Sequence, residues 1–469
     1  MREKMDKVWM KLIVSIFVIS SAGADTGYFW HITDFHWDFS YWTDQLSCNG
    51  MNITQPGMFG NQWCDSPFEL VQATVQGISD VKNDVDFILW TGDSVPHMSP
   101  ASLSKDRNKE LVRNITNLMK DNFTEQVPVY ATFGNHDYYP RDQYPPHGDP
   151  LYNATYDIWK SWISNSADNI TDAQSKTFLK GGYYTVLARP GLRIIAMNSN
   201  LYYTKDLQSQ NFDDPADQFS WLDNVLTEAK RNNEKTILTG HVPPGYTTPR
   251  AVRWMTKKFN HKFVDIVQRH ADVIVAMHFG HEHHDNFRLF YDSTGSPVVS
   301  LFIAPSVTPW RYQLPTGEKE PPHNPGARLV AYDRQTGKQL DIYQYYLDLN
   351  KANTDKFAKW LLGYNATSLY GINDVTAASM GALVNKMTSS QESHFMSYVK
   401  WYNTNADARS YPCDDTCYEI VMCGLKNLEE DAFSKCLPSK PINGTSSLYI
   451  NIFIIVFTCL LSLLMISLS

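Results

Sequence analysis

The chain has 469 residues, of which 43% are hydrophobic, enough for one large domain or two medium ones with a buried core. Its 41 basic and 49 acidic residues give a formal charge of −8, and no long basic run occurs. This balance argues against a nucleic-acid scaffold as the partner, and it says nothing of the oligomeric state.

Residues 1–24 are expected to be a secretory signal peptide. Four basic residues precede the apolar run LIVSIFVIS (residues 12–20). Ala22 and Ala24 then form a small-x-small cleavage pattern before Asp25. The alternative is an uncleaved anchor helix, but the apolar run is short for spanning a bilayer.

Seven short β-rich apolar runs are predicted as buried strands, and several end at polar residues. They cover residues 27–36, 85–93, 127–137, 192–199, 235–244, 272–283 and 298–306. Helical patterns lie between them, one over residues 66–82, which opens with the cap-like Ser66-Pro67, and one over about 104–120. Strands that alternate with helices predict an α/β architecture, which we assign to residues 25–343. From residue 344 the pattern looks helical, and we expect a helical subdomain over residues 344–440.

Six of the seven cysteines are expected to form disulfides. They are Cys48, Cys64, Cys413, Cys417, Cys423 and Cys436. Closeness in sequence favours one bridge between the first two and two bridges inside the late group. A zinc ribbon is the alternative for the late group, but an oxidising compartment favours disulfides.

Secretion is also consistent with seven N-x-[ST] sequons, of which the first six are candidate glycosylation sites. The sequons are at Asn52, Asn114, Asn122, Asn153, Asn169, Asn365 and Asn443.

Residues 441–469 are expected to be a glycosylphosphatidylinositol (GPI) attachment signal. The run LYINIFIIVFTCLLSLLMISLS (448–469) is almost wholly apolar, and the small residues NGTSS (443–447) precede it. A plain transmembrane helix is the alternative, but the basic flank that usually follows such a helix is missing. We therefore expect a protein anchored by lipid to the extracellular face of the cell membrane.

The polar residues at the strand ends form an ordered set of motifs: D-x-H, G-D, G-N-H-D, G-H and G-H-x-H. The candidate ligands in this set are Asp34, His36, Asp93, Asn135, His241, His281 and His283. In open α/β sheets, reactive groups gather past the carboxyl ends of the strands. Imidazole nitrogens with hard oxygens suit Zn²⁺, Mn²⁺ or Fe, and seven ligands are too many for one tetrahedral ion. Two ions about 3.5–4 Å apart that share a carboxylate would use them all.

The stretch MHFGHEHHDNF (277–287) does not fit a zincin protease, whose motif is H-E-x-x-H. Asp285 stands four residues after His281, where the second histidine of that motif would have to be.

The motif set over residues 34–283 resembles that of the calcineurin-like metallophosphoesterases. GDSVPH, GNHDYYP and YPCDDTC are similar to acid sphingomyelinase and more so to the acid sphingomyelinase-like phosphodiesterases, and the apolar tail points to their GPI-anchored, b-type members. The resemblance implies a four-layer α/β/β/α sandwich with a C-terminal helical, disulfide-bonded subdomain, and two zinc ions per chain.

The resemblance also implies which residues hold each ion. One zinc would be held by Asp34, His36, Asp93 and His283. The other would be held by Asp93, Asn135, His241 and His281, with Asp93 bridging. His278 and His284 are then expected to support the site from behind or to lie on the surface.

A hydroxide that bridges the two ions is expected to attack the phosphodiester, and the leaving oxygen then needs a proton. The family pattern offers His97 and His136 as this acid or as phosphate donors, although His97 could be a loop residue and His136 a supporting donor. Tyr138, Tyr139 and Arg141 follow directly and are candidates for one wall of the substrate pocket, unless their loop is only a rigid surface feature.

These inferences predict a membrane-anchored zinc phosphodiesterase that hydrolyses phosphodiester or phosphoanhydride bonds of nucleotides, nucleotide-alcohols or phospholipid headgroups. A sphingomyelinase proper is less expected, because the first motif follows the cleavage site too closely for a saposin domain. Purple acid phosphatases differ in having D-x-G and G-D-x-x-Y. The alternative from another class is an anchored protein that acts mainly by binding lipid or a receptor.

Overall fold

The computed structural model describes residues 25–48, 50–51, 53–164, 171–312, 320–406 and 413–437. The predicted signal peptide, the predicted attachment signal and the sequons at Asn52, Asn169 and Asn443 lie outside these residues. None of the described helices has the length and apolar composition needed to cross a membrane.

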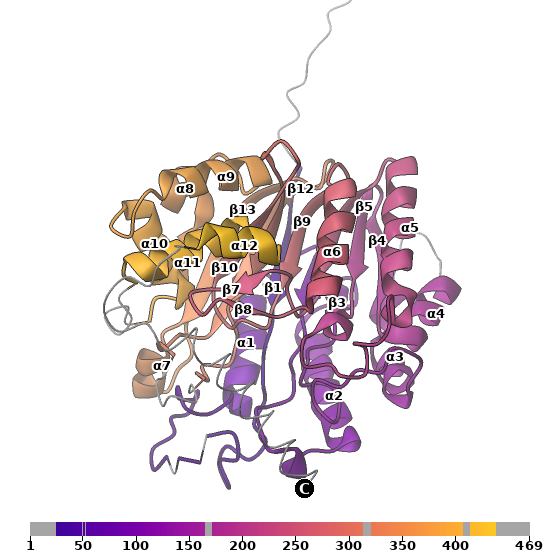
Figure 1. Ribbon diagram of the computed structural model, residues 1–469. Helices are drawn as coiled ribbons and strands as arrows, with labels where there is room; N and C mark the ends of the chain where they lie inside the picture. The colour runs from indigo at the N-terminus through magenta and orange to yellow at the C-terminus, as the bar shows by residue number, and fades with distance from the viewer. Residues whose placement is uncertain are drawn as a thin grey trace, which may run out of the picture.

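Two six-stranded mixed sheets form the centre of the molecule (Figure 1). The first has the order β14-β13-β12-β1-β2-β3. Its strands are β1 (Thr26–Ile32), β2 (Phe87–Trp90), β3 (Val129–Ala131), β12 (Gly326–Asp333), β13 (Gln339–Leu347) and β14 (Trp360–Asn365). Strands β1, β2 and β3 are parallel, and the three later strands extend the sheet in antiparallel fashion.

The second sheet has the order β10-β11-β9-β6-β5-β4. Its strands are β4 (Tyr184–Arg189), β5 (Leu192–Ala196), β6 (Lys235–Thr239), β9 (Ile274–Phe279), β10 (Asn286–Tyr291) and β11 (Pro297–Ile303). The four inner strands are parallel, and an antiparallel strand closes each edge. A separate hairpin joins β7 (Tyr246–Thr247) to β8 (Val252–Arg253).

The two sheets pack against each other through buried aromatic side chains. Phe29 of β1 stacks on Phe87 and also contacts the edge of the His278 ring on β9, with ring centroids 4.7 and 5.2 Å apart. At the other edge, the Tyr184 hydroxyl of β4 donates to the Ala131 carbonyl of β3 at 3.0 Å. Both faces of the inner strands are therefore buried, which explains why they read as nearly continuous apolar runs.

Helices flank the paired sheets (Figure 1). They are α1 (Phe68–Val81), α2 (Lys105–Asn122), α3 (Pro150–Ile163), α4 (Thr171–Gly181), α5 (Gln218–Arg231) and α6 (Lys257–Arg269), with short 3₁₀ turns at Pro100–Ser102, Ser199–Tyr202 and Pro215–Asp217. Helix α2 begins where the Ser104 hydroxyl accepts from the Arg107 amide, and its buried face carries Leu111, Ile115 and Met119 at helical spacing.

The predicted α/β fold is confirmed, and each of the seven predicted strands and both predicted helices is present. The strands are shorter than predicted, because their polar ends belong to loops. The sequence patterns missed β4, β7, β8, β10, β12, β13 and β14.

After β13 ends at Leu347, the C-terminal part of the chain is helical, as predicted, apart from one strand, whereas residues 344–347, also predicted as helical, are the end of β13. Its helices are α7 (Leu349–Asp355), α8 (Ala366–Tyr370), α9 (Ala377–Lys386), α10 (Ser393–Tyr402), α11 (Asp415–Lys426) and α12 (Glu430–Cys436). The prediction of helix was wrong at Trp360–Asn365, which forms β14 at the edge of the first sheet. Trp360 packs over Gly77 of α1 and its indole N–H donates to the Ala73 carbonyl at 3.0 Å, so tertiary contacts decide this segment.

Three disulfides are present, and they follow closeness in sequence: Cys48–Cys64, Cys413–Cys417 and Cys423–Cys436. The four cysteines of the late group are paired in two disulfides and have no free thiolate for a metal, so the zinc-ribbon alternative is wrong.

Candidate active site

The structure brings together all seven candidate ligands at one edge of the paired sheets. Asp34 and His36 follow β1, Asp93 follows β2, and Asn135 follows β3. From the second sheet, His241 follows β6, and His281 and His283 follow β9. The carboxyl ends of parallel strands from both sheets thus meet at one place, as the position of the motifs predicts.

Two carboxylates lie between the histidines. The Asp34 Oδ1 atom is 3.4 Å from His283 Nε2 and 3.6 Å from His36 Nε2. The Asp93 Oδ2 atom is 3.4 Å from His36 Nε2 and 3.1 Å from His241 Nε2. His36 therefore faces both carboxylates, and Asp93 lies between His36 and His241.

The Asn135 amide completes the second half of the cluster. Its oxygen is 3.0 Å from His241 Nε2 and 2.8 Å from His281 Nδ1. Its amide nitrogen donates to Asp142 Oδ1 at 2.7 Å. Asp142 thereby turns the oxygen of Asn135, the atom with which an amide can bind a cation, toward the histidines.

The donor atoms fit divalent metal ions. Ligands about 2.0–2.1 Å from a tetrahedral zinc ion lie roughly 3.3 Å from one another, which is the spacing seen here. Among the described residues, neither Asp34 Oδ1 nor His36 Nε2 has a hydrogen-bond partner, although both atoms are buried. A bound cation would satisfy both. Two donor groups that share Asp93 emerge, one with Asp34 and His36 and one with His241 and His281.

The loops that carry these ligands have unusual backbone conformations. Five of the seven candidates have a positive φ: Asp34 (53°), His36 (42°), Asp93 (58°), His281 (75°) and His283 (64°). Left-handed backbone is uncommon for residues other than glycine and costs on the order of 1–3 kcal/mol per residue. The surrounding contacts must therefore hold these loops in place.

Asp137 provides one such set of contacts. Its buried carboxylate accepts from the backbone amides of Asp93 (3.1 Å), Ser94 (2.7 Å) and Gly134 (2.8 Å). The G-D loop and the G-N-H-D loop are thereby tied together. A Cβ at Gly134 would lie 2.0 Å from Asp93 Oδ1, so only glycine allows this close approach.

Opposite charges shape the protonation of the metal-free site. Burial lowers the pKa of His36 and His241, but the Asp93 and Asp34 carboxylates outweigh it and raise both pKa values to about 9. Burial raises the pKa of Asp34, but the facing histidines hold it well below its usual range. Protons and metal ions therefore compete for the same nitrogens.

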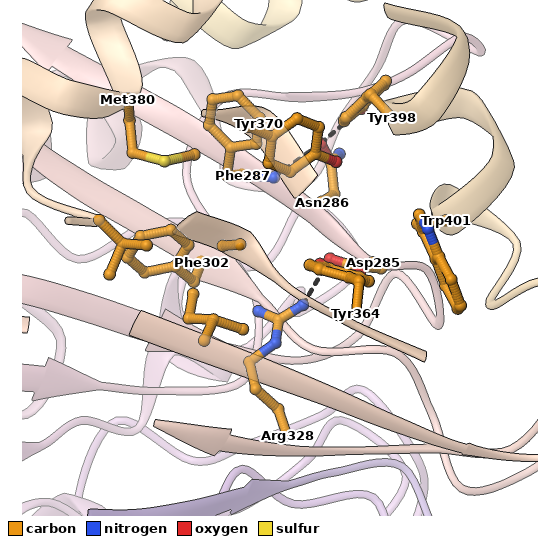
Figure 2. Close-up of a pocket in the computed structure, with 13 residues that line it drawn as sticks. Asp285, Asn286, Phe287, Phe302, Arg328, Tyr364, Tyr370, Met380, Tyr398 and Trp401 are labelled. Atoms are coloured by element: carbon orange, nitrogen blue, oxygen red, sulfur yellow. Dashed lines mark hydrogen bonds and ion pairs between the residues drawn. The ribbon is translucent and has the colours of Figure 1, made fainter. Parts of the chain in front are cut away.

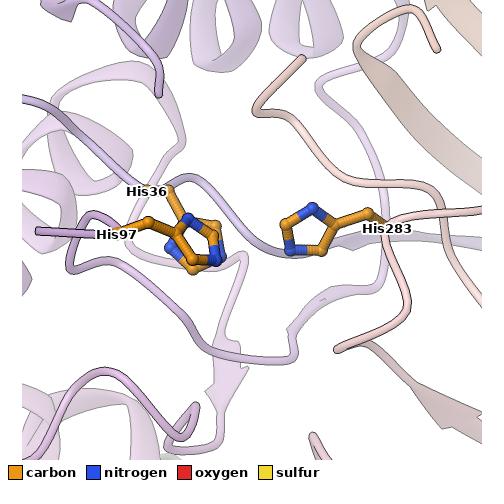
Figure 3. A group of neighbouring side chains, drawn as sticks. All are labelled: His36, His97 and His283. Atoms are coloured by element: carbon orange, nitrogen blue, oxygen red, sulfur yellow. The ribbon is translucent and has the colours of Figure 1, made fainter. Parts of the chain in front are cut away.

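His97 and His136 lie beside this cluster, as the motif positions predict. The ligand-capable nitrogens of His36, His97 and His283 lie within 4.8 Å of one another (Figure 3). The His136 ring is 4.4 Å from the His97 ring, and the His136 amide donates to Asp93 Oδ1 at 2.8 Å. Burial, together with His36 and His283, lowers the pKa of His97 well below 6.5.

His281 is enclosed on its outer side by aromatic rings. Trp254 contacts its ring edge-on at 4.5 Å and Tyr203 at 5.1 Å. The Trp254 N–H donates to buried Glu282 at 2.8 Å, and Glu282 pairs with buried Arg288. Arg288 also donates to the carbonyls of residues 244 and 246, at 2.6 Å each, so this pair connects the His281 loop to the loop after His241.

His278 and His284 are not ligand candidates in the structure, and neither lies on the surface. His278 is buried between the sheets, where its Nε2 is 2.8 Å from the Gln339 amide nitrogen. His284 is buried against Tyr402, with the rings stacked at 4.4 Å. Of the two predicted alternatives for these residues, a place behind the site is the one that agrees with their burial.

The predicted pocket-wall residues differ in exposure. Tyr138 is buried, and its hydroxyl donates to Asp149 at 3.1 Å, which fixes the loop. Tyr139 is half-buried against a small cluster with Val95 and Met98. Arg141 is 43% exposed, and its Nε atom lies 3.9 Å from Asp142 Oδ2.

A small cavity behind the site is too small for a substrate. It has a volume of about 20 Å³ and lies where β10 and β11 meet helices α8, α9 and α10 (Figure 2). Arg328 pairs with Asp285 on its wall, and Tyr364 donates to the same carboxylate at 2.6 Å. These contacts fix the segment that directly follows His284.

The candidate glycosylation sites among the described residues differ in how exposed their side chains are. Asn153 on α3 is exposed, and Asn114 and Asn122 on α2 are half-buried. The amide nitrogen of Asn365, the atom that carries a glycan, donates to Asp341 at 2.9 Å. Asn153 is therefore the most accessible of these sites.

The sequence patterns missed several residues of the site. Asp65, Asp142, Trp254 and Trp310 belong to no recognisable motif, and only the fold brings them near the ligands. Asp137 could have been found, because it is the last residue of the G-N-H-D motif.

We expect the Asp137→Asn substitution to weaken metal binding by roughly 10–100-fold, because an amide cannot replace a carboxylate that accepts three backbone N–H groups. Competition with a chromophoric chelator measures this affinity, and thermal unfolding reports on the fold. Asp121→Asn, at an exposed position of α2, is the matched control. Unchanged metal affinity in Asp137→Asn would contradict the assigned role.

Comparisons with known proteins agree with this geometry. The family model "Calcineurin-like phosphoesterase" matches residues 27–285, and the model "Acid sphingomyelin phosphodiesterase C-terminal region" matches residues 296–443. Human "Cyclic GMP-AMP phosphodiesterase SMPDL3A" is 37% identical over 420 residues, which cover 88% of this chain and 90% of that protein. Mouse "Acid sphingomyelinase-like phosphodiesterase 3b" is 34% identical over 455 residues, which cover 94% and 95% of the two chains. "Sphingomyelinase phosphodiesterase C" of Dictyostelium discoideum is 34% identical over 434 residues, covering 88% of this chain and 92% of that protein. The chain belongs to the calcineurin-like phosphoesterases and, within them, to the acid sphingomyelinase-like phosphodiesterases, which are metal-dependent enzymes.

Proposed function

We propose that the chain is a dinuclear zinc phosphodiesterase of the secretory pathway. The observation that carries this proposal is the pair of donor groups that share Asp93, with spacings suited to tetrahedral ions. Zinc fits the mixture of imidazole nitrogens and carboxylate or amide oxygens.

Each ion has its own donor set in this proposal. Asp34, His36, Asp93 and His283 hold the first. Asp93, Asn135, His241 and His281 hold the second. When bound, the ions neutralise phosphoryl oxygens and supply an activated water at neutral pH.

The residues of the chain carry out the remaining steps. The donor cluster would hold the cations against which the anionic phosphate binds, with the leaving oxygen of the phosphate toward His97 and His136. As a water oxygen bonds to phosphorus, the bond to the leaving oxygen breaks and leaves an electron pair on that oxygen, and a ring N–H of His97 supplies the proton. His136, held through its backbone by Asp93, donates a hydrogen bond to the phosphate.

The substrate class in this proposal is a phosphodiester or phosphoanhydride of a nucleotide, a nucleotide-alcohol or a lipid headgroup. The names of the relatives point to a cyclic dinucleotide and to sphingomyelin, which share only the phosphodiester. Arg141 and the half-buried Tyr139, which follow the G-N-H-D motif closely, suit an anionic or aromatic part of the substrate. A binding protein with incidental catalysis is the second candidate, but the complete donor set favours an enzyme.

Location outside the cytosol is supported by the disulfides, which form in oxidising compartments. Anchoring through GPI, in place of a transmembrane helix, is proposed from the composition of residues 441–469.

A panel of phosphodiesters tests the activity of the purified protein. The panel contains a nucleoside triphosphate, cytidine diphosphocholine, a cyclic dinucleotide and sphingomyelin. We expect hydrolysis of at least one of them, lost on chelation and restored by zinc. Asp93→Asn should reduce it by more than about 10³-fold, because each ion loses a ligand. Activity that survives both treatments would disprove the proposal.

Treatment of intact cells with a phosphatidylinositol-specific phospholipase C tests the anchor. We expect the protein to appear in the medium, since the enzyme cleaves the lipid of a GPI anchor. A protein that stays on the cells after a known GPI-anchored control has been released would support a transmembrane tail instead.

A further inference from the structure

One buried carboxylate contacts His97 and belongs to neither donor group. Asp65 is fully buried, and its Oδ1 atom lies 3.0 Å from His97 Nδ1. Its Oδ2 atom accepts from the His97 backbone amide at 2.5 Å. The same carboxylate therefore fixes both the backbone and the ring of His97.

Asp65 is itself held by the loop that contains Ser47, which lies well before β2 in the sequence. Strand β2 is the strand that leads to His97. Its backbone amide donates to the Ser47 hydroxyl at 2.9 Å, and Ser47 donates to Asp38 at 2.6 Å. Cys48 and Cys64, the neighbours of Ser47 and Asp65, are joined by a disulfide. The Thr308 hydroxyl adds a third donor to the carboxylate, at 3.1 Å.

The His97 ring is fixed on its faces as well. Trp310 stacks on it with centroids 3.9 Å apart and planes 8° apart. The His36 ring is 4.1 Å away. Because Nδ1 is bonded to Asp65, Nε2 is the ring nitrogen that remains for chemistry at the cluster.

We propose that Asp65, presented by the loop that Cys48–Cys64 closes, is the positioning residue of His97 and directs its Nε2–H to the leaving oxygen of the substrate. This inference rests on the proposed function. In the step it serves, the oxygen of the activated water bonds to phosphorus, and the bond from phosphorus to the leaving oxygen breaks with its electron pair going to that oxygen. The leaving oxygen takes the Nε2 proton of His97, which enters the step as an imidazolium and leaves it as the neutral ring with its proton on Nδ1. Asp65 accepts from Nδ1 throughout and is not consumed.

Two other roles would use the same contacts. A carboxylate bonded to an imidazole also orients histidines that bind metals, in which case Asp65 would serve a ligand. Asp65 could also only support the loop. The three roles differ in what they predict for metal content and for the leaving group.

The test compares two phosphodiesters that differ only in the leaving group. One releases a nitrophenol and the other releases an alkyl alcohol. A nitrophenolate departs without a proton, whereas an alkoxide needs one. We expect Asp65→Ala to slow the alkyl ester by about 10²-fold, within the usual contribution of a general acid, and the nitrophenyl ester by less than about threefold. Asp65→Asn, which keeps an acceptor oxygen, should fall between Asp65→Ala and the wild type.

Three further variants make the outcome specific. In a His97→Ala background, Asp65→Ala should add less than about threefold, because a residue that acts through His97 has nothing left to position. Asp38→Asn removes a carboxylate from the same network without touching His97, and it should leave the ratio of the two rates unchanged. Asp93→Asn should abolish both reactions.

Each contrary result is decisive. Equal loss on both esters in Asp65→Ala, or the same leaving-group effect in Asp38→Asn, would reduce Asp65 to loop support. Loss of bound zinc in Asp65→Ala would make His97 a ligand. If His97→Ala slowed both esters equally, His97 would not be the acid and the inference would fall while the metal-dependent activity stood. Full activity in Asp93→Asn would instead overturn the proposed function.

Discussion

The position of a single buried carboxylate, that of Asp93, is the constraint on which the rest of the site depends. Its Oδ2 atom faces His36 from one group and His241 from the other, and its Oδ1 atom accepts from the His136 amide. A carboxylate that is 2% exposed needs compensating positive charge. Protonated histidines supply it in the metal-free protein, and metal ions would supply it in the active enzyme.

The fold makes this convergence possible by packing two sheets face to face. The parallel strands of both sheets end at the same edge, so loops distant in sequence deliver their side chains to one point. The energetic cost lies in the loops, where left-handed backbone and close approach must be maintained. Buried contacts outside the ligand set offset it: Asp137 ties together two loops of the first sheet, and the Glu282–Arg288 pair ties together two loops of the second.

The meeting of the seven candidate ligands could be predicted from the sequence, because each of them sits in a short motif at the end of an apolar strand. Closeness in sequence also predicted the Cys48–Cys64 bridge and two bridges inside the late group, but it left the pairing within that group open. Asp65 was not, because it follows a cysteine in a loop without a pattern and meets His97 only through the fold. Strand β14 was missed for a related reason: the contact of Trp360 with Gly77 and Ala73 decides its conformation, and no local pattern records that contact. His278 and His284 show the limit of motif reading, since their neighbours in the chain are ligand candidates while they themselves are buried behind the site.

The central claim is that Asp93 is shared by two metal ions. Elemental analysis of freshly purified, active protein, combined with anomalous diffraction at the zinc edge, tests it most directly. The account predicts two zinc ions per chain on either side of Asp93, about 3.5–4 Å apart. An active protein with a single ion, or with two ions of which neither contacts Asp93, would contradict it.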